Sequence, residues 1–107
     1  MAVNTVNREQ FEELLRGDKP VLIDYTATWC GYCRRLEPVY NHIAEEYSDV
    51  LVAAKIDIDA EEQLSDEEQI EIIPTLVLYK YGKAAGSVIN PASKAAIDEF
   101  IKTALEK

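Results

Sequence analysis

The spacing of apolar residues along this chain predicts an alternation of helices and strands. Apolar positions recur at three- and four-residue steps after Asn7 and again over 30–47, which is typical of amphipathic helices. Continuous apolar runs at 20–25 and 50–58 predict buried strands. The remaining expected elements are a short strand at 2–6, an acidic helix at 60–69, a hairpin of strands at 75–79 and 84–89, and a last helix that opens at Asn90-Pro91.

The order of these elements predicts an α/β fold with a central mixed β-sheet flanked by α-helices on both faces. Parallel crossover units come first and an antiparallel hairpin follows, so both kinds of strand pairing meet in one sheet. The strand at 20–25 should be central, and Pro38 should kink the helix at 30–47. No repeat or Gly/Ser linker divides the 107 residues, so we expect a single domain, 1–107.

Acidic residues outnumber basic ones, and the resulting negative charge disfavours binding to anionic partners. Twenty Asp and Glu against 11 Lys and Arg give a net charge of -9, which repels nucleic acid and anionic membrane surfaces. No apolar run reaches the roughly 18 to 20 residues of a membrane span, and the N-terminus lacks the features of a signal peptide. We therefore expect a cytoplasmic protein, while an exported protein without its signal would share these features. We also expect it to act as a monomer.

Both cysteines lie in the segment Trp29-Cys30-Gly31-Tyr32-Cys33, where a buried strand passes through a short loop into a helix. Residues three apart on a helix share one face, at a separation that permits a disulfide. Free backbone N–H groups and the positive end of the helix dipole stabilise a thiolate in the first helical turn, where we place both sulfur atoms. We expect Cys30, at the tip, to be the exposed nucleophile and Cys33 to be the shielded thiol that attacks the mixed disulfide.

A zinc site and a pair of ordinary buried thiols are the alternatives for this motif. A structural zinc site needs four ligands, and the chain has no third cysteine. His42, the only histidine, lies in the middle of a predicted helix. We therefore expect His42 on the helix surface, and we expect neither a metal ion nor a cofactor.

Several further residues fit the cysteine motif. An acid lies in the first buried strand (Asp24), a lysine in the second (Lys55), a proline within the helix (Pro38), and the run Ile73-Pro74-Thr75 opens a later strand. On these residues together, the chain resembles the thioredoxin family over nearly its whole length. The resemblance implies a thioredoxin fold and a thiol-disulfide oxidoreductase that reduces protein disulfides through a mixed disulfide. It also implies disulfide-containing client proteins and a thioredoxin reductase as electron donor.

The strand pattern around Asp24 suggests a chemical role for this acid. Burial should desolvate the carboxyl and raise its pKa, which makes Asp24 a candidate proton acceptor when Cys33 ionises. We favour this catalytic contribution, with Lys55 in a supporting role. The alternative is a structural acid paired with Lys55, and the two roles are compatible.

The predicted substrate-binding residues surround the dithiol, and they are Trp29, Gly31, Tyr32, Ile73 and Pro74. Trp29 and Tyr32 should form an apolar docking surface with Ile73. The resemblance implies a cis Pro74 that turns the backbone of Ile73 toward the cysteines, where it can pair with an extended substrate. A trans proline that merely begins a strand is the alternative.

Three positions depart from the family pattern. Tyr32 stands where thioredoxins usually carry proline, Ile72 stands where a glycine often precedes the Ile-Pro pair, and 88–91 lacks the glycine usually found before the last helix. Tyrosine occurs at this position in some disulfide isomerases, so an isomerase or oxidant is the second functional class. A non-enzymatic binding subunit with the same fold is the third, and the intact cysteine pair argues against it.

Overall fold

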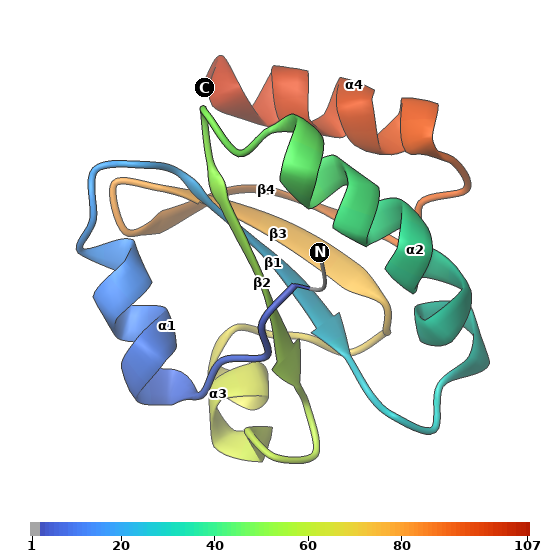
Figure 1. The fold of residues 1–107 in the computed structure, drawn as a ribbon. Coiled ribbons are helices and arrows are strands. Elements are labelled where there is room, and N and C mark those ends of the chain that lie inside the picture. The colour runs from blue at the N-terminus through green and yellow to red at the C-terminus, as the bar shows by residue number, and fades with distance from the viewer. Residues whose placement is uncertain (1–2) are drawn as a thin grey trace.

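A four-stranded sheet lies between two pairs of helices in this protein (Figure 1). The structure is a computed structural model, and it describes residues 3–107. In chain order the elements are α1 (Arg8–Leu15), β1 (Val21–Thr26), α2 (Gly31–Glu46), β2 (Val52–Asp57), α3 (Glu62–Glu67), β3 (Thr75–Lys80), β4 (Lys83–Ile89) and α4 (Lys94–Leu105). None of the helices in this described part has both the length and the apolar character that crossing a membrane requires.

The sheet contains both kinds of strand pairing, as predicted. Its strand order is β2-β1-β3-β4. β1 pairs in parallel with β2 and antiparallel with β3, and β3 pairs antiparallel with β4. β1 is therefore central, and every residue in it except Thr26 is buried.

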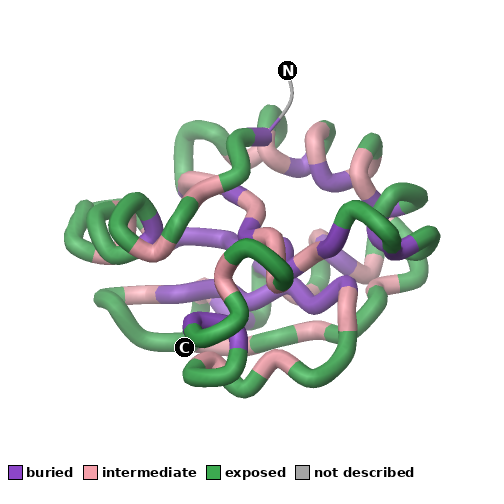
Figure 2. Tube along the Cα trace, turned by 90° about the horizontal axis from the view of Figure 1, so that it is seen from below, coloured by how far each residue is buried: buried purple, intermediate pink, exposed green. Residues whose placement is uncertain are grey.

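The helices cover the two faces in pairs, with α2 and α4 on one face and α1 and α3 on the other (Figure 1). Side chains of β1 alternate between the two cores: Leu22 packs on the α2/α4 side, whereas Ile23 and Tyr25 pack on the α1/α3 side. Because strand side chains alternate with a period of two, Asp24 shares the α2/α4 face with Leu22. Figure 2 shows buried stretches along the strands and on one side of the helices, with much of the remaining chain exposed.

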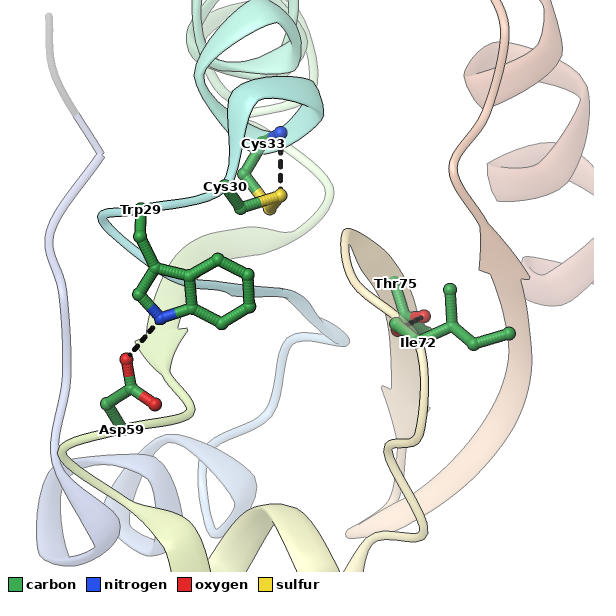
Figure 3. Close-up of a disulfide and its surroundings, with 6 residues drawn as sticks. All are labelled: Trp29, Cys30, Cys33, Asp59, Ile72 and Thr75. Carbon is green, nitrogen blue, oxygen red and sulfur yellow. Dashed lines mark hydrogen bonds between the residues drawn. A yellow bond between two sulfur atoms is a disulfide. The ribbon is translucent and has the colours of Figure 1, made fainter.

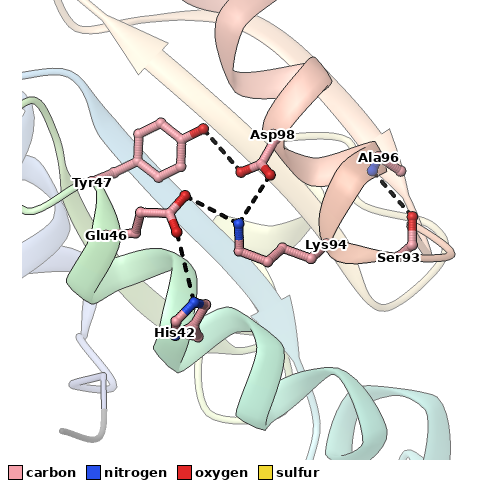
Figure 4. Close-up of polar contacts among 7 residues, drawn as sticks. All are labelled: His42, Glu46, Tyr47, Ser93, Lys94, Ala96 and Asp98. Atoms are coloured by element: carbon pink, nitrogen blue, oxygen red, sulfur yellow. Dashed lines mark hydrogen bonds and ion pairs between the residues drawn. The ribbon is translucent and has the colours of Figure 1, made fainter.

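Polar contacts join α2 to α4 at the surface (Figure 4). Lys94 Nζ lies 3.1 Å from Glu46 Oε1 and 3.0 Å from Asp98 Oδ2, and the Tyr47 hydroxyl donates to Asp98 Oδ1. His42 Nε2 lies 3.7 Å from Glu46 Oε2 and its side chain is 61% exposed, which confirms the predicted surface position. Because these groups are largely exposed to solvent, the pairs contribute little to stability, and the apolar core contributes more to helix packing.

The strand predicted at 2–6 is wrong. In the part that the structure describes, this segment forms one isolated parallel bridge, between Thr5 and Lys55. The backbone N–H of Lys55 also donates to the carbonyl of Asn4 at 2.9 Å. Val3 packs in the α2/α4 core and Val6 against the α1/α3 core, but Asn4 and Thr5 between them are exposed, so each face of the segment has a single apolar contact. Ala2 lies outside the described residues.

The strand predicted at 50–58 is present, but it is an edge strand and is only half-buried. β2 has β1 as its one neighbour in the sheet order. Only Ala54 and Ile56 are buried within it. A run of small and β-branched residues does not by itself distinguish an edge strand from a central one.

The last helix begins later than the predicted start at 90–91. α4 starts at Lys94, and Ser93 is its N-cap residue, with Oγ accepting the backbone N–H of Ala96 at 3.2 Å. Asn90 instead has a left-handed backbone, with a φ of 42°. That conformation belongs to a turn, so the serine hydroxyl takes the capping position.

Candidate active site

The two cysteines form a disulfide at the N-terminus of α2 (Figure 3). β1 ends at Thr26, and after a short loop α2 begins at Gly31 with Cys30 as its N-cap residue. The Cα atoms of Cys30 and Cys33 are 5.2 Å apart, and the backbone N–H of Cys33 donates to Cys30 Sγ at 3.2 Å. Since the first N–H groups of a helix lack partners within it, Sγ replaces a capping oxygen here. The electropositive end of α2 therefore faces Cys30 Sγ, where it stabilises a thiolate.

Two expectations about Cys30 are corrected by this geometry. Cys30 caps the helix instead of lying within its first turn. It is also a buried residue, only 7% exposed, although it is more accessible than Cys33 at 2%. The cause is packing: Ala27 is in the same buried cluster as both cysteines, and Ile73 packs against that cluster.

Trp29 is held beside the disulfide by a carboxylate that the sequence analysis missed. Trp29 is 65% exposed, and its Nε1 donates to Asp59 Oδ2 at 2.6 Å (Figure 3). Asp59 comes just after β2, and the carboxyl ends of the parallel strands β1 and β2 lie at the same edge of the sheet. The sequence signal for this contact is therefore an acid that follows the second strand of a parallel pair.

The loop before β3 lies across from the disulfide (Figure 3). The peptide bond between Ile73 and Pro74 is cis, which confirms what the resemblance implied. Ile73 packs against the disulfide, whereas Ile72 is 55% exposed. The Thr75 hydroxyl donates to the carbonyl of Ile72 and so closes the loop. The loop therefore places Ile73 against the disulfide, while the exposed Ile72 side chain points away from it (Figure 3).

A groove of about 310 Å³ opens on the Tyr32 side of the disulfide. Its lining residues are Tyr32, Arg35, Leu36, Val39, Asn90, Pro91, Ala92 and Ser93. Tyr32 is 58% exposed, and the guanidinium carbon of Arg35 lies 5.3 Å from the centre of its ring. Gly31 is also exposed, and a Cβ added there would have no atom within 4 Å, so close packing does not require glycine at this position.

Asp24 is buried in the sheet, as predicted. It is 1% exposed, and its Oδ1 atom has no hydrogen-bond partner among the described residues. Loss of hydration raises the pKa of Asp24 from 3.8 to about 7, with the nearby Glu37 charge also raising it and Lys55 lowering it. A carboxyl with a pKa near neutrality can both accept and release a proton under physiological conditions.

Lys55 does not form the ion pair with Asp24 that the structural alternative required. The two residues are register partners on the neighbouring strands β1 and β2. Among the residues that the structure describes, however, the ion-pair partner of Lys55 is Glu37, whose Oε1 lies 3.2 Å from Lys55 Nζ. The sequence analysis missed Glu37, because it lies on α2 and its spacing along the chain does not reveal which strand residue it reaches.

The model of the thioredoxin family matches residues 2–103 of the chain. A thioredoxin from Acidithiobacillus ferridurans is 38% identical over 105 residues, covering 97% of this chain and 97% of that protein. A bifunctional thioredoxin reductase/thioredoxin from Mycobacterium leprae is 34% identical over 97 residues, which are 91% of this chain and 21% of that protein. Among solved structures, a mutant thioredoxin from Halobacterium salinarum NRC-1 superposes with a TM-score of 0.84 at 29% identity, covering 94% of this chain and 88% of the other.

These matches agree with the geometry. The element order and the cysteine spacing predicted the mixed sheet with helices on both faces and the disulfide at the start of α2, and the resemblance implied the cis proline. The chain belongs to the thioredoxin family and is a thiol-disulfide oxidoreductase that reduces protein disulfides through the pair Cys30 and Cys33.

Proposed function

We propose that Cys30 attacks the client disulfide and that Cys33 completes the exchange. The observation that carries this assignment is the hydrogen bond from the Cys33 N–H to Cys30 Sγ, because it places the stabilising helix N-terminus at the Cys30 sulfur. The greater accessibility of Cys30 supports the same order.

Two exchange steps then transfer the electrons. In the first, the Cys30 thiolate bonds to one client sulfur, and the other client sulfur leaves as a thiolate. In the second, Cys33 loses its proton and attacks Cys30 Sγ, which closes the Cys30–Cys33 disulfide and releases the second client thiolate. The client disulfide gains two electrons and two protons, and the dithiol of this chain loses them.

Asp24 is the proposed acceptor of the Cys33 proton, with Lys55 as a supporting residue. Three observations favour Asp24: its burial on the α2 side of the sheet, its unpartnered Oδ1 atom and a pKa close to neutrality. A carboxylate that lacks a hydrogen-bond donor gains most from taking up a proton.

The client is proposed to bind over the residues around the disulfide, of which Ile73 is half-buried and Pro74 is buried. These residues, here called the docking surface, are Trp29, Gly31, Tyr32, Ile72, Ile73 and Pro74. Trp29 and Tyr32, which flank Cys30 in the chain, are each more than half exposed, and large exposed apolar side chains close to one another mark interaction sites. We propose that the backbone of Ile73 pairs with an extended client segment.

A thioredoxin reductase is the proposed electron donor, and the chain is proposed to act as a single, monomeric domain in the cytoplasm. The Mycobacterium leprae relative, whose name joins a thioredoxin reductase to a thioredoxin, supports the choice of donor. Turnover of a client disulfide with NADPH and the reductase of the same organism tests it. Absence of turnover beside an active reductase control would exclude that donor.

Trapping of the mixed disulfide tests the order of the cysteines. The Cys33→Ser variant, reduced and then mixed with a disulfide-bonded peptide, should accumulate a covalent adduct, because no second thiol can release the client. The Cys30→Ser variant should accumulate little adduct, since its remaining thiol is 2% exposed in the structure. Mass spectrometry of both variants measures the adduct, and the reverse pattern would assign the nucleophile to Cys33.

A further inference from the structure

Two carboxylates and one lysine lie close together on the α2 side of β1 and β2. Asp24 and Lys55 are register partners in parallel strands, so their side chains lie next to each other on one face. Glu37 reaches the same lysine from α2. Lys55 therefore has two neighbouring carboxylates: Asp24 on the adjacent strand β1 and Glu37 on α2.

The structure shows which carboxylate holds the ammonium group. Lys55 Nζ is 3.2 Å from Glu37 Oε1, while Asp24 Oδ1 has no hydrogen-bond partner within residues 3–107. Solvation explains the preference: the Glu37 side chain is 46% exposed and the Lys55 side chain 15%, whereas Asp24 is 1% exposed. Pairing with Glu37 keeps the ammonium group near water, and pairing with Asp24 would draw it into the core.

We propose that Glu37 is a positioning residue for disulfide exchange: by holding Lys55 Nζ, it keeps the ammonium group from pairing with Asp24 and leaves that carboxylate free to take up a proton. This proposal rests on the role proposed above for Asp24. The Glu37 carboxylate acts through Lys55, its ion-pair partner.

The other groups that face Asp24 do not replace Lys55. From α2, the Tyr40 hydroxyl is buried but bonds to the carbonyls of Leu22 and Ala54, at 3.0 Å and 2.8 Å. From β3, the register partner of Asp24 is Leu76, which is apolar. The α4 residues in the same core are also apolar, and they are Ile97, Ile101 and Ala104. Lys55 and Glu37 are therefore the charged groups that set the protonation of Asp24.

The direction of the coupling follows from these contacts. The Glu37 charge raises the pKa of Asp24 and the Lys55 charge lowers it. Replacement of Glu37 by glutamine removes the raising charge and also frees the ammonium group to approach Asp24. Both changes favour the ionised carboxylate, so they lower the pKa of Asp24 together.

Titration of the Asp24 carboxyl by NMR in the oxidised protein measures the coupling without any assay of activity. Glu37→Gln should move the midpoint of Asp24 to lower pH by about one unit or more, as expected when a cation comes within contact distance. Glu13→Gln is the matched control, because it removes the same charge from an exposed position on α1, and it should leave the midpoint unchanged.

A double-mutant cycle separates the action through Lys55 from direct repulsion between the two carboxylates. In a Lys55→Gln background, Glu37→Gln should shift the Asp24 midpoint by less than half as much as it does with Lys55 present. An unchanged midpoint in Glu37→Gln, or the same shift in both backgrounds, would overturn the proposal.

The pH profile of activity connects this coupling to exchange. The midpoint in the rate of client reduction should move to lower pH in Glu37→Gln, in step with the NMR midpoint. A rate profile that stays in place while the NMR midpoint moves would overturn the catalytic part of the proposal. The Asp24→Asn variant tests the role of Asp24 by itself. If it reduces the client as fast as the wild type does, Asp24 is not the proton acceptor, whereas a shift of the Asp24 midpoint by NMR would still show that Glu37 acts on this carboxyl.

Discussion

At the scale of single residues, Asp24 combines a chemical role with a cost to the fold. The sign of its effect on stability follows from linkage. The carboxyl has a pKa of about 7 in the folded protein against 3.8 ordinarily, so between these values the folded state binds more protons than the unfolded one. Stability is therefore lost as pH rises from about 4 to 7 and then levels off, by on the order of 4 kcal/mol for a shift of this size.

The first prediction is that Asp24→Asn stabilises the protein in a pH-dependent way. The gain in free energy of unfolding should be small at pH 4, where both side chains are neutral, and should reach several kcal/mol by pH 8. The same variant should reduce client disulfides more slowly at neutral pH, because asparagine cannot accept the Cys33 proton. Urea denaturation at several pH values checks the first effect, and a gain that does not change with pH would contradict the linkage.

The second prediction concerns Tyr32, the residue between Gly31 and Cys33. Tyr32 supplies a backbone N–H in the first turn of α2, which proline would remove, and a donor near the sulfurs favours the thiolate. The N–H that bonds Cys30 Sγ belongs to Cys33 and is retained in Tyr32→Pro, so the effect should be modest. We expect Tyr32→Pro to lower the reduction potential by roughly 30 mV or less, equivalent to about 1.4 kcal/mol.

Equilibration of Tyr32→Pro and the wild type against glutathione measures this difference. The wild-type reduction potential from the same measurement also helps to decide between a reductase and an isomerase, because disulfide isomerases have higher reduction potentials than thioredoxins. Tyr32→Ala is the matched control, because it removes the phenol ring but keeps the N–H, and its potential should stay near that of the wild type. A proline variant with the same or a higher potential would show that the N–H is not the cause.

At the scale of elements, the sequence predicts best where local chemistry determines the structure. Asn7 and Gln10, three residues apart in the chain, form a capping box at the start of α1, with backbone-to-side-chain hydrogen bonds of 2.8 and 2.9 Å. The start of α4 was misplaced because Asn90 and Ser93 are both good capping residues, and only the fold decides which of them has the extended backbone of a cap. The ion pair of Lys55 with Glu37 depends on how α2 lies over β2, which periodicity does not specify.

A partly buried hydrogen-bond chain anchors the end of α3 to the sheet. The Tyr79 hydroxyl donates to Glu68 Oε1 at 2.6 Å, and its oxygen lies 2.7 Å from the Tyr25 hydroxyl. Since a hydroxyl has one hydrogen, Tyr25 must be the donor to Tyr79. Glu68 is the C-cap residue of α3, so this chain fixes the point where the loop toward the docking surface begins.

The third prediction is that Tyr79→Phe costs more stability than Tyr25→Phe. Removing the Tyr79 hydroxyl breaks both bonds and leaves the buried Tyr25 hydroxyl without a partner, which costs about 1 to 3 kcal/mol. Removing the Tyr25 hydroxyl keeps the bond from Tyr79 to Glu68 and should cost about 1 kcal/mol. Urea denaturation of both variants and of the double variant checks this, and a double variant much less stable than Tyr79→Phe would contradict the orphaned hydroxyl.

At the scale of the whole molecule, the fold class could be predicted because the order of elements restricts the ways they can pack. The parallel pair, the hairpin and the central strand all follow from that order together with the apolar runs. The edge position of β2 could not be predicted, because it depends on how far the N-terminal segment pairs with β2, and this pairing stops at the single bridge between Thr5 and Lys55. The same holds for the active site. The sequence identified the cysteines, Asp24 and Pro74 from local motifs, but it missed Asp59 and Glu37, which reach the site from other elements.

The last prediction concerns the net charge of -9, which places like charges close together in the folded state. The ion pairs of the described residues lie mostly at partly exposed positions, so each contributes little, and repulsion among the excess carboxylates dominates the electrostatics. Sodium chloride screens this repulsion, with a Debye length of about 10 Å at 0.1 M. The melting temperature at pH 7 should therefore rise by several degrees between 10 mM and 0.5 M salt, since each 1 kcal/mol corresponds to about 4 °C.

The same series at pH 4.5, near the sequence isoelectric point, should show no rise, because the net repulsion is then absent and only the attractive pairs are screened. An equal rise at both pH values would point to specific ion binding or to strengthened apolar burial instead of charge repulsion.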